Sequence, residues 1–550
     1  MPPISFQLGA YENRVDERLR EWSAQGFARR LWAKDYTLWS RTPLPEITDR
    51  LGWLDLPRSS QDEVPSWNAF RDEIVRAGFA NVILLGMGGS SLAPEVFEAT
   101  FGNAPCHPPL AVLDSTHPDA ILKLEHHLDL ASSLIVVSSK SGTTIETISL
   151  FRHFDLDIPV LRAGSESHFV AITDPETPLA RTAALRKFRG VFSAPTDIGG
   201  RYSALSAFGL LPGALVGMDL NDLLQRARAM AETCGPSDAE GGLKLGAALG
   251  ELALAGRDKV TFIASPSLAS FPQWLEQLIA ESSGKDGKGM IPIVDEPLGD
   301  PAAYGSDRIF VGLELEGEPE RERQEILAAL ESRGHPIVRI HLGAKSDLGA
   351  EMFRWEIAVA AACAVLGVHP FNQPDVEIAK QIARKVLHET AGAGPGADPA
   401  AVLSRDPKAA SGAIASLVRA GRAGDYVCFQ TYLAPSPDIA RLIRAMRQLV
   451  GERTSLATTA GYGPRFLHST GQLHKGGPAT GLFIQLVDRS PRDFRISGET
   501  SSWGDLIRAQ SLGDYQALRE RNRRVVRLDL ASDPVAALEA IAHELGPALG

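Results

Sequence analysis

Short apolar runs alternate with amphipathic helical patterns through most of this 550-residue chain. Val82–Leu85 and Leu134–Val137 are typical, each long enough for one strand that is buried on both faces. Strands that alternate with helices form parallel sheets covered by helices on both faces. We predict strands at residues 82–86, 109–113, 134–138, 169–173, 190–193, 259–264, 308–313 and 337–341, and again at 426–432, 454–458, 481–487 and near 524.

Two of these strands lead into loops whose composition suits an anion. GMGGSS occupies residues 86–91, and SSKSGTTIET occupies residues 138–147. Each loop opens a predicted helix, where backbone N–H groups and the helix dipole favour negative charge. The spacing matches neither a dinucleotide fingerprint nor a P-loop. A helix start needs only one hydroxyl as its cap, so the many hydroxyls of the second loop favour a sugar phosphate monoester over a plain cap.

Two further segments suit proton transfer. Gln277 and Glu281 lie about one helical turn apart in WLEQLIAESSGK, so they share a face near the end of a predicted helix. Arg201 follows a double glycine in GGRYS, and its permanent charge suits a developing enolate or a phosphate. Taken singly, the carboxylate fits a solvated helix end and the arginine fits a surface ion pair.

Together the four segments resemble the glucose-6-phosphate isomerase family, and they occur in that family's order. A fifth match is PFNQPDVEIAK, residues 370–380, which is similar to the family's late signature ending in an active-site lysine, here Lys380. With its tail GYGPRFLHSTGQLHKGG, the chain is most similar to the isomerase half of bifunctional transaldolase–glucose-6-phosphate isomerases. No transaldolase half is expected within these residues.

The resemblance implies an α/β fold with two sugar isomerase (SIS) domains, each an αβα sandwich around a parallel sheet. A helical N-terminal segment is expected over residues 1–60, with the first domain at 61–235 and the second at 236–390. Residues 391–424 are rich in Ala and Gly and are predicted to be a linker with one or two short helices. The C-terminal βα segment, residues 425–550, is expected to complete the second domain.

The resemblance also implies a role for each matched residue. Glu281 would move a proton between neighbouring sugar carbons, and Arg201 would stabilise the enediolate. Gln277 and the backbone of Gly89 and Gly200 would orient the sugar. The expected phosphate ligands are Ser90, Ser139, Lys140, Ser141, Thr144 and Thr147. No metal or other cofactor is implied, because no residues have ligand spacing and Arg201 can take the place of an electrophile.

The sequence leaves open which group opens the sugar ring. Lys380 is one candidate. The family's histidine normally follows the Gln–Glu helix, but EPLGDPAAYGSDR at that place contains none. STGQLHKGG offers His474 later in the chain, and His468 lies six residues earlier as a rival. We predict His474, with a plain loop histidine as the alternative.

The composition of the chain argues against several classes of partner and cofactor. The net charge of −11 and the pI near 5.7 argue against non-specific nucleic-acid binding. The four cysteines form no CxxC pair, so we expect neither zinc nor a disulfide framework, and a reducing compartment fits. No signal segment or membrane span is predicted, which favours the cytoplasm and no membrane partner. The family resemblance suggests a homodimer.

We therefore predict an aldose–ketose isomerase of glycolysis and gluconeogenesis that interconverts glucose 6-phosphate and fructose 6-phosphate. One alternative is an isomerase of mannose or amino-sugar phosphates. A second alternative is a non-catalytic sugar-phosphate sensor with the SIS fold. A sensor needs only the phosphate loop, so the joint presence of Glu281, Gln277, Arg201 and Lys380 favours the enzyme.

Overall fold

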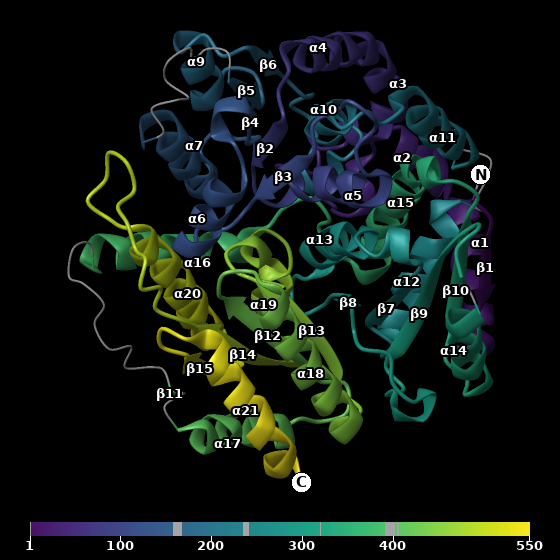
Figure 1. Ribbon diagram of the computed structural model, residues 1–550. Helices are drawn as coiled ribbons and strands as arrows, with labels where there is room; N and C mark the ends of the chain where they lie inside the picture. Colours follow the sequence, from purple (N-terminus) through teal and green to yellow (C-terminus); the bar gives the residue numbers. More distant parts are fainter. Residues whose placement is uncertain (1, 158–167, 235–240, 320, 391–401, 404–405) are drawn as a thin grey trace.

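Helices cover three separate five-stranded β-sheets in this protein (Figure 1). The computed structural model describes residues 2–157, 168–234, 241–319, 321–390, 402–403 and 406–550. The strands pair in parallel, apart from one antiparallel edge strand near the N-terminus. The predicted α/β class with parallel sheets is therefore confirmed.

The first sheet positions the two anion-suited loops. Its strands are β2 (Asn81–Leu85), β3 (Leu110–Leu113), β4 (Ser133–Ser138), β5 (Phe169–Ile172) and β6 (Gly190–Phe192), in the order β3-β2-β4-β5-β6. All five were predicted. The chain leaves β2 on one side for β3 and returns on the other side for β4, so the strand order reverses between β2 and β4. Ligands of open α/β sheets bind outside the carboxyl ends of the strands at such a reversal.

The second sheet carries the helix with Gln277 and Glu281. It contains β7 (Lys259–Ala264), β8 (Ile291–Ile293), β9 (Arg308–Leu315) and β10 (Ile337–Leu342). Its helices are α12 (Gly242–Leu254), α13 (Phe271–Ser283), α14 (Arg321–Ser332) and α15 (Leu348–Leu366). In the part of the chain that the structure describes, no helix is long and apolar enough to cross a membrane.

The C-terminal strands form a third sheet and add no strand to the second one. They are β11 (Val402–Leu403), β12 (Tyr426–Tyr432), β13 (Ala457–Tyr462), β14 (Gly481–Val487) and β15 (Arg524–Asp529), in the order β11-β15-β14-β12-β13. The expectation that this segment completes the second domain stays a prediction, although the segment would do so without extending the second sheet. The edge strands of the second sheet are β8 on one side and β1 (Ile4–Gln7) on the other. β1 comes from the N-terminus and pairs antiparallel with β10.

Helices of the same C-terminal segment cover the third sheet. They are α17 (Pro407–Arg419), α18 (Pro437–Thr454), α20 (Trp503–Glu520) and α21 (Pro534–Leu549). We call the described residues from 402 onward the C-terminal unit. Of the predicted linker, residues 391–401 and 404–405 lie outside the described residues, and its remainder includes α17. The other domain boundaries stay predictions.

The three sheets share one strand order. The order is β3-β2-β4-β5 in the first sheet, β8-β7-β9-β10 in the second and β13-β12-β14-β15 in the third. In each series the second strand along the chain lies beside the first on one side, and the third and fourth follow on the other side. Each sheet therefore has its own reversal of strand order.

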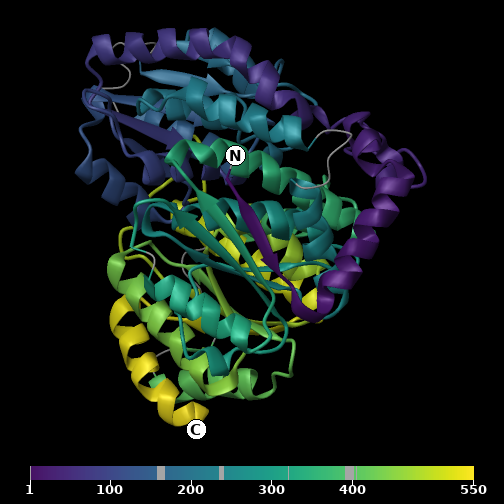
Figure 2. The same cartoon turned by 90° about the vertical axis from the view of Figure 1, so that its right-hand side faces the viewer.

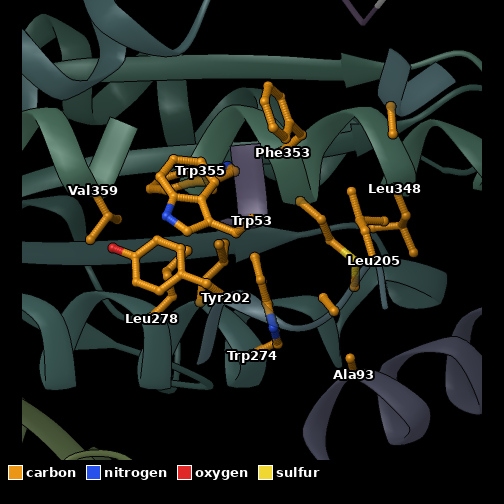
Figure 3. Packing of buried hydrophobic residues seen from close by; sticks show 14 of the residues in the cluster. Trp53, Ala93, Tyr202, Leu205, Trp274, Leu278, Leu348, Phe353, Trp355 and Val359 are labelled. Atoms are coloured by element: carbon orange, nitrogen blue, oxygen red, sulfur yellow. The ribbon is translucent and has the colours of Figure 1, made fainter. Parts of the chain in front are cut away.

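The N-terminal segment joins the first two sheets. After β1 it forms α1 (Glu12–Gln25), α2 (Phe27–Trp32) and α3 (Leu56–Ser59), and α4 (Val64–Ala77) follows on the first sheet's side (Figure 2). The predicted helical character is confirmed, although β1 was not predicted. Trp53 is fully buried, with its ring centroid 5.0 Å from that of Tyr202 and 6.0 Å from that of Phe353 (Figure 3). Arg201 precedes Tyr202 in the chain, and its guanidinium carbon lies 6.0 Å from the Tyr202 ring centroid.

We expect Trp53→Ala to lower the free energy of unfolding by about 3–5 kcal/mol, because it leaves a large cavity among close-packed rings. Urea unfolding followed by far-UV circular dichroism measures the change. Leu44→Ala is the control, since Leu44 is 40% exposed. Equal midpoints for the two variants would contradict a structural role for Trp53.

Candidate active site

The predicted carboxylate is buried. Helix α13 ends at Ser283, just before Gly284, and places Gln277 and Glu281 on one face with exposures of only 3% and 8%. The Gln277 amide nitrogen Nε2 donates to Glu281 Oε2 at 3.1 Å and to the backbone oxygen of His468 at 2.7 Å. The solvated helix end considered above does not apply, because the surrounding chain covers this turn.

Arg201 orients the same carboxylate and is not a surface residue. It lies in a short 3-10 helix, η8 (Gly200–Tyr202), with an exposure of 3%. Its guanidinium Nη1 is 3.4 Å from Glu281 Oε1. Nε donates to the Ser282 hydroxyl at 2.9 Å, and Nη1 also donates to Gln373 Oε1 at 3.0 Å. The guanidinium therefore ties the end of α13 to the segment that contains Gln373.

Close backbone approach explains two glycines of the loop after β2. A Cβ on Gly89 would lie 2.0 Å from the backbone oxygen of Gly200, so no other residue fits without displacing η8. Gly88 has a positive φ of 54°. A Cβ there would lie 2.8 Å from Gln277 Nε2 and 2.8 Å from the His468 backbone oxygen. The two glycines thus allow the loop after β2 to approach η8, Gln277 of α13 and the backbone of His468.

The hydroxyl-rich loop follows β4 and leads into α7 (Ile145–Asp157). The hydroxyls of Ser139 and Thr144 are 3.0 Å apart. The hydroxyl of Thr147 is buried, and among the described residues it has no hydrogen-bond partner. The Lys140 ammonium pairs with the Asp174 carboxylate at 2.5 Å. The loop therefore offers mainly neutral donors, with the lysine charge already balanced.

A cavity of about 290 Å³ opens beside this loop. Ser141 and Thr144 line it on one side. Lys380, on α16 (Pro374–Thr390), and His468 line it as well. The structure thus brings together part of the predicted phosphate loop, the predicted lysine and the histidine that was only the rival candidate. Ser90 is buried in the turn directly after Gly89.

His468 belongs to a polar network that reaches into this cavity. Its ring nitrogen Nε2 is 3.1 Å from Glu146 Oε1, and the Gln510 amide donates to the same oxygen at 2.8 Å. Burial by itself would raise the pKa of Glu146, but His468 and, to a lesser degree, Lys380 outweigh it and hold the pKa below its usual value. Glu146 is therefore a carboxylate at neutral pH, and it orients the imidazole.

His474, the predicted ring-opening residue, lies in the core of the C-terminal unit. Its exposure is 4%, its Nδ1 is 3.1 Å from the Gln430 amide nitrogen, and its Nε2 is 3.7 Å from the Cys428 sulfur. Burial lowers its pKa well below the usual histidine value. Among the described residues, His474 does not line the cavity beside the hydroxyl-rich loop. It also takes no part in the contacts of Glu281 and Arg201 given above.

We compared the chain with known protein families and with proteins of similar sequence. The sequence model of the phosphoglucose isomerase family matches residues 68–299. The chain is similar to glucose-6-phosphate isomerase of Rubrobacter xylanophilus, with 28% identity over 61% of this chain and 89% of that protein. It is also similar to glucose-6-phosphate isomerase of Thermus thermophilus, with 35% identity over 43% of this chain and 56% of that protein.

Over part of its length the chain is therefore similar to glucose-6-phosphate isomerases. The solved structure of a hypothetical protein from Thermus thermophilus superposes with a TM-score of 0.59 at 26% identity and covers 70% of this chain and 99% of that one. A glucose-6-phosphate isomerase from Chlamydia trachomatis superposes with a TM-score of 0.51 at 21% identity, covers 70% of this chain and 85% of that one, and shows a shared fold.

Several site residues were not assigned from the sequence. Glu146 and Gln373 lie within the motifs SSKSGTTIET and PFNQPDVEIAK, so both could have been considered. Gln510 had no local signal, because only the packing of α20 brings it to Glu146. Lys285 of SSGK is 3% exposed, and its ammonium donates to the backbone oxygen of Ser282 at 2.8 Å. Burial lowers the pKa of Lys285 well below its usual value.

We expect Gly89→Ala to lower the melting temperature, because its methyl group would displace the Gly200 carbonyl and with it Arg201. Gly200→Ala is a matched control, since a Cβ at that position meets nothing within 4 Å. Differential scanning calorimetry of both variants makes the comparison. A wild-type melting temperature for Gly89→Ala would show that the two loops do not meet as described.

Proposed function

We propose that this protein is an isomerase that interconverts glucose 6-phosphate and fructose 6-phosphate through an enediolate. The observation that carries the proposal is the buried Glu281 carboxylate, held by Gln277 on one oxygen and facing Arg201 on the other. Aldose–ketose isomerisation needs one base that moves a proton between two neighbouring carbons and polar groups beside their oxygens. Relatives with this activity in their names support the choice of sugar.

In this proposal Glu281 takes the proton from one carbon and returns it to the other. Gln277 and Arg201 fix its two oxygens, so the carboxylate meets the substrate in one orientation. Arg201 also donates to Pro370 and Asn372 backbone oxygens at 2.7 and 3.0 Å. Most of its donors are thus occupied by protein, and we assign it two tasks: holding Glu281 and placing positive charge near the enediolate.

The phosphate group is proposed to lie against the start of α7. Ser139, Ser141 and Thr144 would donate hydroxyl hydrogens. The Thr147 hydroxyl, which has no partner among the described residues, is a further donor. Ser90 and the backbone of Gly89 and Gly200 would border the sugar. Lys140 is paired with Asp174, so we assign it to holding the loop in place, with a weaker direct role toward phosphate than the sequence suggested.

Ring opening is proposed to use His468, with Lys380 as a second polar group in the same cavity. His468 lines that cavity beside the hydroxyl-rich loop, whereas His474 is enclosed by the core. Glu146 holds the His468 imidazole, in the arrangement of a general acid–base and its orienting carboxylate. An imidazole suits this step because its ring nitrogens can accept and donate a proton.

Two other activities fit parts of the site less well. An isomerase of mannose or amino-sugar phosphates would use the same phosphate loop, and turnover of each sugar distinguishes it. A sugar-phosphate sensor would not need a buried carboxylate held by both an amide and a guanidinium. A cytoplasmic location, a homodimer with shared sites and kinship with the isomerase half of transaldolase fusions belong to this proposal and rest on the family resemblance.

We expect Glu281→Gln to reduce isomerisation by at least about 10²-fold, because the amide cannot accept the proton. Conversion of fructose 6-phosphate, coupled to oxidation of glucose 6-phosphate, measures the rate. Binding of the sugar phosphate, measured by calorimetry, should stay close to wild type because the phosphate loop is intact. A rate within a few fold of wild type would remove Glu281 as the base.

We expect His468→Ala to impair turnover of the cyclic sugar phosphate and to spare proton exchange at C2 of erythrose 4-phosphate. That tetrose cannot close a ring through its phosphorylated oxygen, so it needs only Glu281. Loss of both reactions to the same extent would place His468 outside ring opening.

His474→Ala is the comparison variant. Because His474 fills the core, we expect a lower melting temperature and an unchanged ratio of the two rates. Glu146→Gln should show the same selective defect as His468→Ala, in weaker form. A selective defect in His474→Ala alone would return the assignment to His474.

A further inference from the structure

A second cavity, of about 330 Å³, lies outside the carboxyl ends of β12 and β14 in the third sheet. Tyr432, the last residue of β12, and Val487, the last residue of β14, both line it. These two strands are neighbours, and the strand order of the third sheet reverses between them. The cavity therefore occupies the place in the third sheet that the hydroxyl-rich loop and its cavity occupy in the first.

The walls of this cavity carry guanidinium groups from separate parts of the chain. Arg527 on β15 is 2% exposed and donates to the Ser511 hydroxyl at 3.1 Å. Arg489 follows β14 and pairs with Asp529 at 3.0 Å. Arg508 on α20 and the exposed Arg495 lie at the rim. Arginine is the side chain best suited to bind phosphate oxygens through two parallel hydrogen bonds.

Carboxylates and an imidazole complete the lining. His117 comes from the loop before α6 (Pro118–His127) of the first sheet and is 1% exposed. Its Nε2 is 2.9 Å from Asp488 Oδ1, so the wall of the cavity is fixed by contact between the first and third sheets. Carboxylates such as Asp488 and Asp493 accept hydrogen bonds from sugar hydroxyls. Arg489 pairs with Asp529 and Arg508 lies 3.5 Å from Asp505, so guanidinium and carboxylate groups lie side by side along the wall. Such a wall suits a ligand that carries both phosphate and hydroxyl groups.

We propose that this cavity is a second ligand site, specific for a small phosphate monoester that also bears hydroxyl groups. Its volume lies within the range of small-molecule sites, about 300–1,000 Å³. The site is separate from the one described above. Leu506 and Gln510 of α20 line the first cavity, whereas Ile507, Arg508 and Ser511 of the same helix line the second.

Binding of ribose 5-phosphate to the full chain, measured by isothermal titration calorimetry, tests the proposal. The wild type should bind two molecules per chain. The double variant Arg495→Gln/Arg508→Gln should weaken one of the two binding events by at least about tenfold, because charged hydrogen bonds are lost. Both arginines lie at the rim, so the variant should keep the wild-type melting temperature and its rate with fructose 6-phosphate.

Arg492→Gln is the matched control. Arg492 is a neighbouring exposed arginine that pairs with Asp119 at 2.6 Å and does not line the cavity, so both binding events should remain. Thr144→Val should weaken the other event, at the first sheet, and leave this one intact. Binding that the double variant leaves unchanged, whether the wild type shows one event or two, would overturn the proposal. A single event that the double variant weakens and Thr144→Val does not would belong to this cavity. If the wild type binds two molecules but does not convert fructose 6-phosphate, the second-site proposal stands. That outcome would contradict only the proposed isomerase activity.

Discussion

The amide nitrogen of Gln277 has two hydrogens, and the structure uses one on each side of the candidate site. One is donated to Glu281 at 3.1 Å and the other to the His468 backbone at 2.7 Å. This single group therefore fixes the buried carboxylate and also the loop of the C-terminal unit that carries the imidazole. Gly88 is a consequence of the same contact, because a side chain at that position would occupy the space of the amide.

The shared strand order of the three sheets explains where the two cavities lie. In each open α/β sheet, the loops that leave two neighbouring strands in opposite directions cannot cover the gap between them. The first sheet fills its gap with hydroxyls and the start of α7. The third sheet fills its gap with arginine and aspartate side chains. One topology thus produces two cavities, and the residues after β4 and β14 make them chemically different.

Most of the fold could be predicted from the sequence, because buried parallel strands are continuous apolar runs. Val82–Leu85 and Leu134–Val137 are examples that the structure places within β2 and β4. The third sheet could not be separated from the second in this way, since apolar runs identify strands but not their partners. β1 was missed for a related reason: ISFQ is short, and only its pairing with β10 makes it a strand.

The site was predictable where its chemistry is local in sequence, as for Gln277 and Glu281 within one helical turn. The histidine depended on a tertiary contact: α19 (Gly471–Gly476) turns His474 toward Cys428 and Gln430, whereas His468 meets Glu146 across more than three hundred residues of sequence.

The two halves of the proposed reaction therefore come from different parts of the chain. The groups for proton transfer lie on α13 and η8, whereas His468 and Gln510 come from the C-terminal unit. Polar contacts dock that unit on the rest. Arg465 pairs with Glu95 and, at 3.2 Å, with Asp114, and the Gln472 amide donates to the Gly284 backbone oxygen at 3.0 Å. Because Gly284 directly follows the turn of Glu281, the same docking that delivers the imidazole also supports the end of the helix that carries the base.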